Sequence, residues 1–103
     1  MKRTERIETM ERYLDEAREA VDRMQEALEV YEAAQKGYRR LCDYYGSAQW
    51  MRDYEADEAG KIPADLKRGV LSEDAVYDLI TDNQELTARM LKLLAQAAEH
   101  STF

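Results

Sequence analysis

The sequence predicts an all-α fold, a long antiparallel helical hairpin formed by a single domain over residues 1–103. Composition is the first observation, because only four Gly and one Pro occur in 103 residues and few positions therefore favour turns. The second is a heptad pattern of apolar residues between Ile7 and Tyr45. The third is a set of capping signals that separates this segment from a short helix and a second long helix.

The first helix is expected over about residues 4–45, with Thr4 as its N-cap. Gly46 is its expected end, because glycine readily adopts the left-handed conformation that closes many helices. Apolar side chains recur at two positions of the heptad, interrupted only by Gln35, and so share one face of the helix. They are Ile7, Met10, Leu14, Ala17, Val21, Met24, Leu28, Tyr31, Tyr38, Cys42 and Tyr45.

A short helix is expected over about residues 48–59. Ser47 is its N-cap and Gly60 closes it, since these residue types favour the two ends of a helix. Three side chains recur at helical spacing and are expected to close the end of the core: Trp50, Met51 and Tyr54.

The second long helix is expected over about residues 73–99, after a short helical turn at residues 63–68. Ser72 is the expected N-cap of this helix. Leu71 and Val76 flank the cap at the spacing of a hydrophobic staple.

The unequal lengths of the two long helices predict self-association. If the last helix packs antiparallel to the first, it ends about a dozen residues before the first helix begins. An exposed apolar seam of that length is typical of an association surface. We therefore expect a homodimer, with Ile7, Met10, Tyr13, Leu14 and Ala17 as the self-association residues. The alternative is a monomer whose N-terminus frays or is covered by the tail that ends in Phe103.

The net charge of −7 comes from acidic residues in the middle and C-terminal parts of the chain. No basic stripe is present, so direct binding of nucleic acid is not expected. Several acids lie toward the C-terminal end of the short helix, where the helix dipole disfavours anions. Either Lys61, Lys67 and Arg68 neutralise them, or a basic partner protein does. The candidate partner-binding residues are Trp50, Asp53, Tyr54, Glu55, Asp57 and Glu58.

Catalytic, cofactor-binding and metal-binding residues are not expected. The one histidine, His100, lies near the end of the last helix, and the one cysteine, Cys42, lies on the heptad seam. The sequence contains neither of the glycine-rich phosphate-binding motifs G-x-x-x-x-G-K-[ST] and G-x-G-x-x-G. The leading hypothesis is thus a non-enzymatic helical interaction protein. Its alternatives are an acidic inhibitor or decoy that binds a basic, nucleic-acid-binding surface of a partner, and a small-ligand-binding protein. The ligand pocket would be lined by Tyr38, Tyr45, Trp50 and Tyr77.

No stretch approaches the roughly 20 apolar residues of a transmembrane helix, and no apolar run follows the basic N-terminal residues. A cytoplasmic protein without membrane contact is therefore expected.

The run DYYGSAQWMRDYEADEAGKIPADLKRGVLSEDAVYDLITDN closely resembles a small bacterial family catalogued as a domain of unknown function. The resemblance extends almost end to end, from the charged N-terminal helix through the tyrosine–glycine corner and the acidic short helix to the start of the last helix. It implies a bacterial, cytoplasmic source. It carries no activity, ligand or catalytic residue to this sequence.

Overall fold

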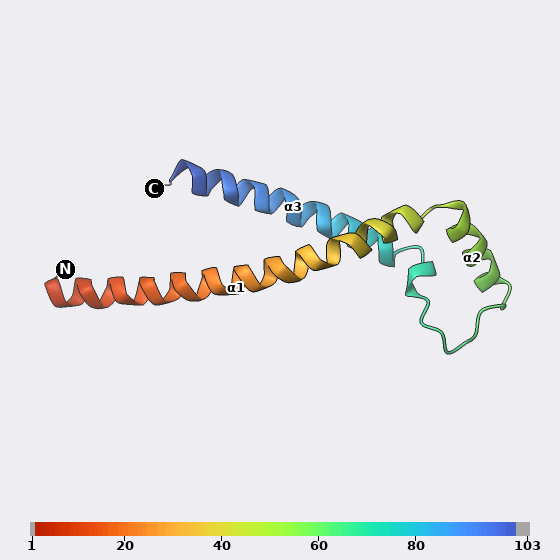
Figure 1. The fold of residues 1–103 in the computed structure, drawn as a ribbon, viewed down its shortest axis with the longest axis horizontal. Coiled ribbons are helices and arrows are strands. Elements are labelled where there is room, and N and C mark those ends of the chain that lie inside the picture. Colours follow the sequence, from red (N-terminus) through yellow and green to blue (C-terminus); the bar gives the residue numbers. More distant parts are fainter. Residues whose placement is uncertain (1, 101–103) are drawn as a thin grey trace. The chain divides into compact units, whose positions relative to one another are not determined.

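The computed structural model describes residues 2–100. All regular structure in this range is helical: α1 (Arg3–Tyr44), α2 (Ala48–Glu58), the 3-10 helix η1 (Gly69–Leu71) and α3 (Ala75–Glu99) (Figure 1). The predicted all-α fold is confirmed, and α1, α2 and α3 each begin and end within two residues of their predicted bounds. The chain divides into two compact units, residues 1–38 and 39–103, which are described separately. The antiparallel packing of the two long helices stays a prediction.

The first unit consists of α1 up to residue 38. Ion pairs one turn apart join Arg12 to Glu16 at 3.7 Å, Arg18 to Asp22 at 3.3 Å and Arg23 to Glu19 at 2.7 Å. Each such exposed pair contributes only about 0.3–0.5 kcal/mol. No residue of α1 is buried, although helices in proteins gain most of their stability from packing an amphipathic face.

The start of α1 differs from the prediction. The helix begins at Arg3, so Thr4 lies in its first turn and is not the N-cap. The Arg6 N–H donates to the carbonyl of Lys2 at 2.9 Å, a helical bond that extends the hydrogen-bond ladder to the first described residue. A cap inferred at Thr4 was therefore wrong because the ladder passes through it.

The corner between α1 and α2 forms as predicted. Gly46 has a φ of 80°, a left-handed conformation that costs a side-chain-bearing residue about 1–2 kcal/mol. The hydroxyl of Ser47 then accepts a hydrogen bond from the Trp50 N–H at 3.1 Å, which makes Ser47 the N-cap of α2.

Gly60 closes α2 with two hydrogen bonds that define a Schellman motif. The N–H of Lys61 donates to the carbonyl of Ala56 at 2.9 Å, and the N–H of Gly60 donates to the carbonyl of Asp57 at 3.0 Å. Gly60 itself has a φ of 72°. The predicted role of this glycine is confirmed.

Within the predicted turn at residues 63–68, one turn forms over residues 63–66, closed by a bond from the Leu66 N–H to the Pro63 carbonyl at 3.1 Å. The short helix of this region is η1, which begins at Gly69, directly after the predicted helical turn at residues 63–68. One hydrogen bond between residues three apart closes a turn, whereas a helix needs successive bonds.

The start of α3 lies two residues later than predicted, at Ala75. The predicted N-cap, Ser72, is therefore wrong, because Asp74 occupies that position. The Ser72 hydroxyl still accepts from the Ala75 N–H at 3.2 Å and donates to the Gly69 carbonyl at 2.7 Å. The Glu73 carbonyl accepts a hydrogen bond from the hydroxyl of Tyr45 at 3.2 Å, in place of a helical bond. The first helical bond is consequently the one from Asp78 to the Asp74 carbonyl.

The core of the second unit contains Trp50, Leu71 and Val76, all of them buried. Both α2 and α3 contact η1, so this short helix connects them. Met51 was expected in the core but is exposed. Adjacent helical residues point about 100° apart, so a helix that buries Trp50 turns Met51 toward solvent.

Candidate functional site

The first candidate site is an exposed apolar face in the first unit. We define the N-terminal apolar face as the five residues Ile7, Met10, Tyr13, Leu14 and Ala17. The four larger side chains are 50–61% exposed, and Ala17 is also exposed. The same face continues through three further exposed side chains, those of Val21, Met24 and Leu28. Exposure of apolar residues in a continuous row marks an interaction surface more often than scattered exposure does.

The face is wider than the seam of a two-stranded coiled coil. A third heptad position, directly before the first apolar one, also carries small or aromatic residues and widens the face. These residues are Tyr13, Ala20 and Ala27. Three apolar positions in seven are typical of a helix in a bundle, whereas a coiled-coil pair uses two.

The length of α3 limits which part of α1 it can cover. Its first residues lie near Leu41, with which Ala75 and Val76 line a common groove in the second unit. The 25 residues of α3 span about 37 Å, whereas Ile7 lies about 50 Å along α1 from Leu41. The described part of α3 is thus shorter than the stretch of α1 between Ile7 and Leu41. Phe103, the alternative cover, lies outside the described residues.

The second candidate site is the acidic and aromatic surface of α2, where Asp53 is bound within the chain. The hydroxyl of Tyr44 donates to Asp53 Oδ2 at 2.6 Å, and Gln49 Nε2 donates to Asp53 Oδ1 at 2.9 Å. These hydrogen bonds, that from Tyr44 foremost, hold the pKa of Asp53 below its usual 3.8. The same bond, with partial burial, raises the pKa of Tyr44 to about 12.

Asp57 also has a partner within the chain. Its Oδ1 forms an ion pair with Arg68 Nε at 3.2 Å, and Arg68 Nη1 donates to the Pro63 carbonyl at 3.3 Å. The predicted neutralisation by downstream cations is therefore confirmed for Arg68. Lys61 and Lys67 form no ion pair within residues 2–100.

The aromatic residues of this surface pack on one another. Tyr54 stacks on Trp50 with ring centres 5.3 Å apart and planes 20° apart, and Tyr45 meets Trp50 edge-on at 5.4 Å. The charges of Glu58 and then Glu73 raise the pKa of Tyr54. Of the six candidate partner-binding residues, four make these intramolecular contacts, which leaves Glu55 and Glu58 as exposed carboxylates. Two of the acids that motivated the decoy hypothesis, Asp53 and Asp57, thus have partners within the chain.

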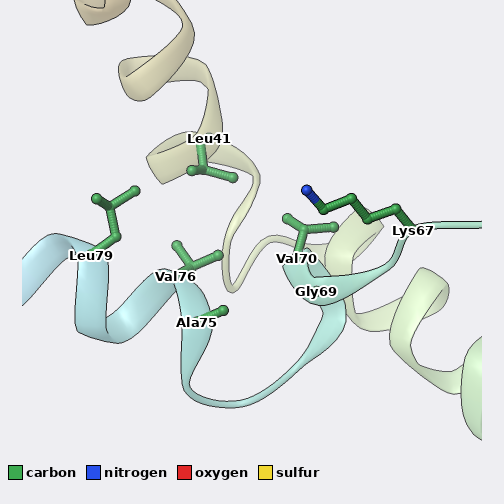
Figure 2. A pocket seen from close by; sticks show the side chains of 7 residues that line it. All are labelled: Leu41, Lys67, Gly69, Val70, Ala75, Val76 and Leu79. Atoms are coloured by element: carbon green, nitrogen blue, oxygen red, sulfur yellow. The ribbon is translucent and has the colours of Figure 1, made fainter. Parts of the chain in front are cut away.

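The third feature is an open apolar groove of about 360 Å³ in the second unit. Figure 2 shows Leu41 of α1 facing Val76 and Leu79 of α3 across it. The complete lining is Leu41, Lys67, Gly69, Val70, Ala75, Val76 and Leu79. Sequence analysis missed Leu41 because this residue lies one position off the heptad seam. Leu41 was not among the residues of the aromatic pocket expected from the sequence. The groove has one charged side chain, that of Lys67, and no acid–base pair.

The described residues contain neither a cluster of metal ligands nor a membrane-spanning helix. Within residues 2–100, no group of three or more His, Cys, Asp and Glu side chains is placed to hold a metal ion. None of the helices in this range has the length and apolar composition needed to cross a membrane. Cys42 is a free, half-buried thiol.

Comparison with known proteins identifies the family. A family described as a domain of unknown function, DUF4298, matches residues 7–93. The chain belongs to the DUF4298 family. The DUF4298 match runs from Ile7 of α1 to Leu93 of α3, so it includes α2, η1 and parts of both units. The resemblance noted in the sequence is thereby confirmed. No curated protein and no solved structure matches this DUF4298 chain significantly.

Proposed function

We propose that this protein is a non-enzymatic helical interaction protein that forms a homodimer through the N-terminal apolar face of α1. The observation that carries the proposal is the exposure of Ile7, Met10, Tyr13 and Leu14 on one face of a helix that buries none of its residues. A bacterial, cytoplasmic location belongs to the proposal and is supported by the resemblance found in the sequence.

The apolar area favours a long interface over a short one. Complete burial of a large apolar side chain is worth about 1.5–3 kcal/mol, so a half-exposed one has about 1 kcal/mol left to gain. Association costs about 4–15 kcal/mol in lost freedom of motion. Burial of the four large side chains of the N-terminal apolar face, counted on both copies, yields a free energy that lies only in the middle of this range of costs. Extension of the contact to Val21, Met24 and Leu28 nearly doubles the gain.

The remaining surface supports a binding role over a catalytic one. The groove beside Leu41 is apolar and open, and it brings no nucleophile next to a base. The most perturbed titratable groups, Tyr44 and Asp53, are hydrogen-bonded to each other at a helix corner. Structural hydrogen bonds also shift pKa values in this way. The hydrogen bond between Tyr44 and Asp53 therefore explains both shifts without a catalytic role.

Sedimentation equilibrium of the wild-type chain tests the proposal, together with the substitutions Leu14→Asp and Val30→Asp. Wild type is expected to be dimeric at micromolar to millimolar concentration. Leu14→Asp should make it monomeric, because the new carboxylate would be buried at the interface. Val30 is an equally apolar, 72% exposed residue outside the heptad positions, so Val30→Asp should leave the dimer intact.

Circular dichroism of the same samples separates loss of the interface from loss of the fold. Leu14→Asp is expected to retain the signal of α2 and α3 while it loses the dimer. A wild-type protein that stays monomeric at high concentration would overturn the proposal. Dimerisation of Leu14→Asp with wild-type affinity would do the same.

A further inference from the structure

Two exposed residues of opposite charge, Glu11 and Arg18, flank the N-terminal apolar face and can pair across an antiparallel dimer. Glu11 follows Met10 and Arg18 follows Ala17, so both occupy the same heptad position one repeat apart. The Arg18 side chain is 65% exposed and, among the described residues, forms an ion pair with Asp22 one turn along, at 3.3 Å. Charges at flanking heptad positions select the orientation of helix partners.

In an antiparallel pair of helices, flanking residues of the same heptad position face each other across the twofold axis. If the axis passes between Leu14 and Ala17, Glu11 of one copy lies opposite Arg18 of the second copy. Twofold symmetry repeats the contact, so the pair gains two intermolecular ion pairs. In a parallel, in-register pair, Arg18 lies opposite Tyr13 and Glu11 lies opposite Arg6, so that arrangement also gains two intermolecular ion pairs. Both directions therefore satisfy these charges, and side-chain volumes decide between them.

Side-chain volumes favour the same register. An axis between Leu14 and Ala17 places each leucine against the small alanine of the second copy. It also pairs Ile7 with Met24, Met10 with Val21, and Tyr13 with Ala20. A parallel pair would instead place Ala17 against Ala17 and Tyr31 against Tyr31, which leaves a gap in one layer and crowds another. Large residues facing small ones fill an interface at native packing density.

We propose that the second copy of this chain docks antiparallel on α1, with its twofold axis between Leu14 and Ala17 and with reciprocal Glu11–Arg18 ion pairs. This inference rests on the proposed homodimer and adds its direction and register. The overlap contains all the exposed apolar side chains from Ile7 to Met24 on both copies. The third apolar position of the face leaves room for a further helix beside the pair, as in a four-helix arrangement.

Disulfide trapping tests the direction. In a Cys42→Ser background, the variants Ile7→Cys and Met24→Cys are prepared separately, then mixed, unfolded, refolded together and oxidised. The antiparallel register predicts a disulfide in the mixture only, between position 7 of one chain and position 24 of the other. Within either variant alone, the two copies of the cysteine would lie about 25 Å apart, whereas a disulfide needs Cα atoms within about 7 Å.

A parallel dimer gives the opposite result, because each variant would then cross-link with itself. That outcome would overturn the direction while the homodimer stands. Absence of any disulfide in a mixture that sediments as a dimer would overturn the register. Failure of the homodimer itself is recognised separately, as a monomeric wild-type chain in sedimentation.

Charge exchange tests the ion pairs in the full chain. Glu11→Arg and Arg18→Glu each place two pairs of like charges at the interface, and each is expected to weaken dimerisation about tenfold at low ionic strength. The double variant restores opposite charges and should recover most of the wild-type affinity. Glu26→Arg, on the outer side of the helix, serves as the control and should change the dimer little. A double variant as weak as its single variants would overturn the pairing of Glu11 with Arg18.

Discussion

The hydroxyl of Tyr44 donates a hydrogen bond to Asp53 Oδ2 at 2.6 Å and so joins the last turn of α1 to the middle of α2. Because Gln49 Nε2 donates to the other oxygen of the same carboxylate, both oxygens of Asp53 are satisfied within the chain. Hydrogen bonds to a charged acceptor are the stronger kind. This relationship explains how an acid can lie at a helix corner without a cation as its main partner.

The first prediction concerns the pH range in which the Tyr44–Asp53 bond stabilises residues 39–103. The pKa of Asp53 is lowered from 3.8, so its contribution is complete above that value and is lost as pH falls through the folded-state pKa. The pKa of Tyr44 is raised from 10.0 to about 12, so its contribution is complete below 10.0 and is lost as pH rises through 12. The unfolding free energies of wild type and Tyr44→Phe should therefore differ most between these limits.

Thermal denaturation at a series of pH values measures that difference. Tyr77→Phe is the control, because Tyr77 is 61% exposed and its loss should not introduce the same pH dependence. A wild-type advantage over Tyr44→Phe that stayed constant from acid to strongly alkaline pH would contradict the assignment.

The second prediction concerns Trp50, which connects α2 to η1. Its Nε1–H donates to the carbonyl of Val70 at 3.0 Å. Trp50→Phe removes this bond and should lower the free energy of unfolding by about 1–3 kcal/mol, because the carbonyl of the half-buried Val70 loses its partner. Trp50→Ala, which also leaves a cavity, should cost about 3–5 kcal/mol. Met51→Ala on the exposed side should change stability by about 0.5 kcal/mol or less. Urea denaturation followed by circular dichroism distinguishes the three, and equal losses would contradict the core position of Trp50.

The third prediction sets two glycines against each other. Gly60 has a φ of 72°, so Gly60→Ala strains the backbone and should destabilise the second unit by about 1–2 kcal/mol. Gly37 lies inside α1, where an added Cβ meets no atom within 4 Å. Gly37→Ala should therefore stabilise α1 by about 1 kcal/mol. Thermal melts should show shifts of opposite sign, and a stabilising Gly60→Ala would refute the role of the left-handed glycine.

Sequence analysis located the ends of α2 because capping depends on local chemistry. Ser47 and Gly60 act within three to five residues of their own positions, so residue type alone predicts their bonds. The predicted burial of Met51 was wrong because the burial of a side chain depends on more than local chemistry. Spacing alone did not distinguish it from its neighbour Trp50, and the packing of α2 on η1 decided which of the two is buried.

Contacts between distant segments were beyond the reach of periodicity. The Trp50–Val70 bond joins residues 20 positions apart, and the Tyr45–Glu73 bond joins residues 28 positions apart. Neither pair shares a helix, so no helical repeat relates them. The groove residue Leu41 was missed in the same way, because it is half-buried through contacts outside the heptad pattern. The apolar face of α1, in contrast, follows from sequence because a single helix carries all of it.

The last prediction concerns the ion pair between Asp57 and Arg68, which decides how the acidic end of α2 is neutralised. The two side chains are 25% and 38% exposed, so solvent screens the pair and its net contribution should be about 1 kcal/mol or less. Arg68→Ala and Asp57→Asn should each reduce stability slightly, and the double variant should lose little more than either one. High salt should shrink the coupling, because screening weakens partly exposed charges. Lys61→Ala removes a nearby cation without an ion pair and should have no comparable effect. Additive losses in a double-mutant cycle would show that Arg68 does not neutralise Asp57 and would direct attention to a basic partner.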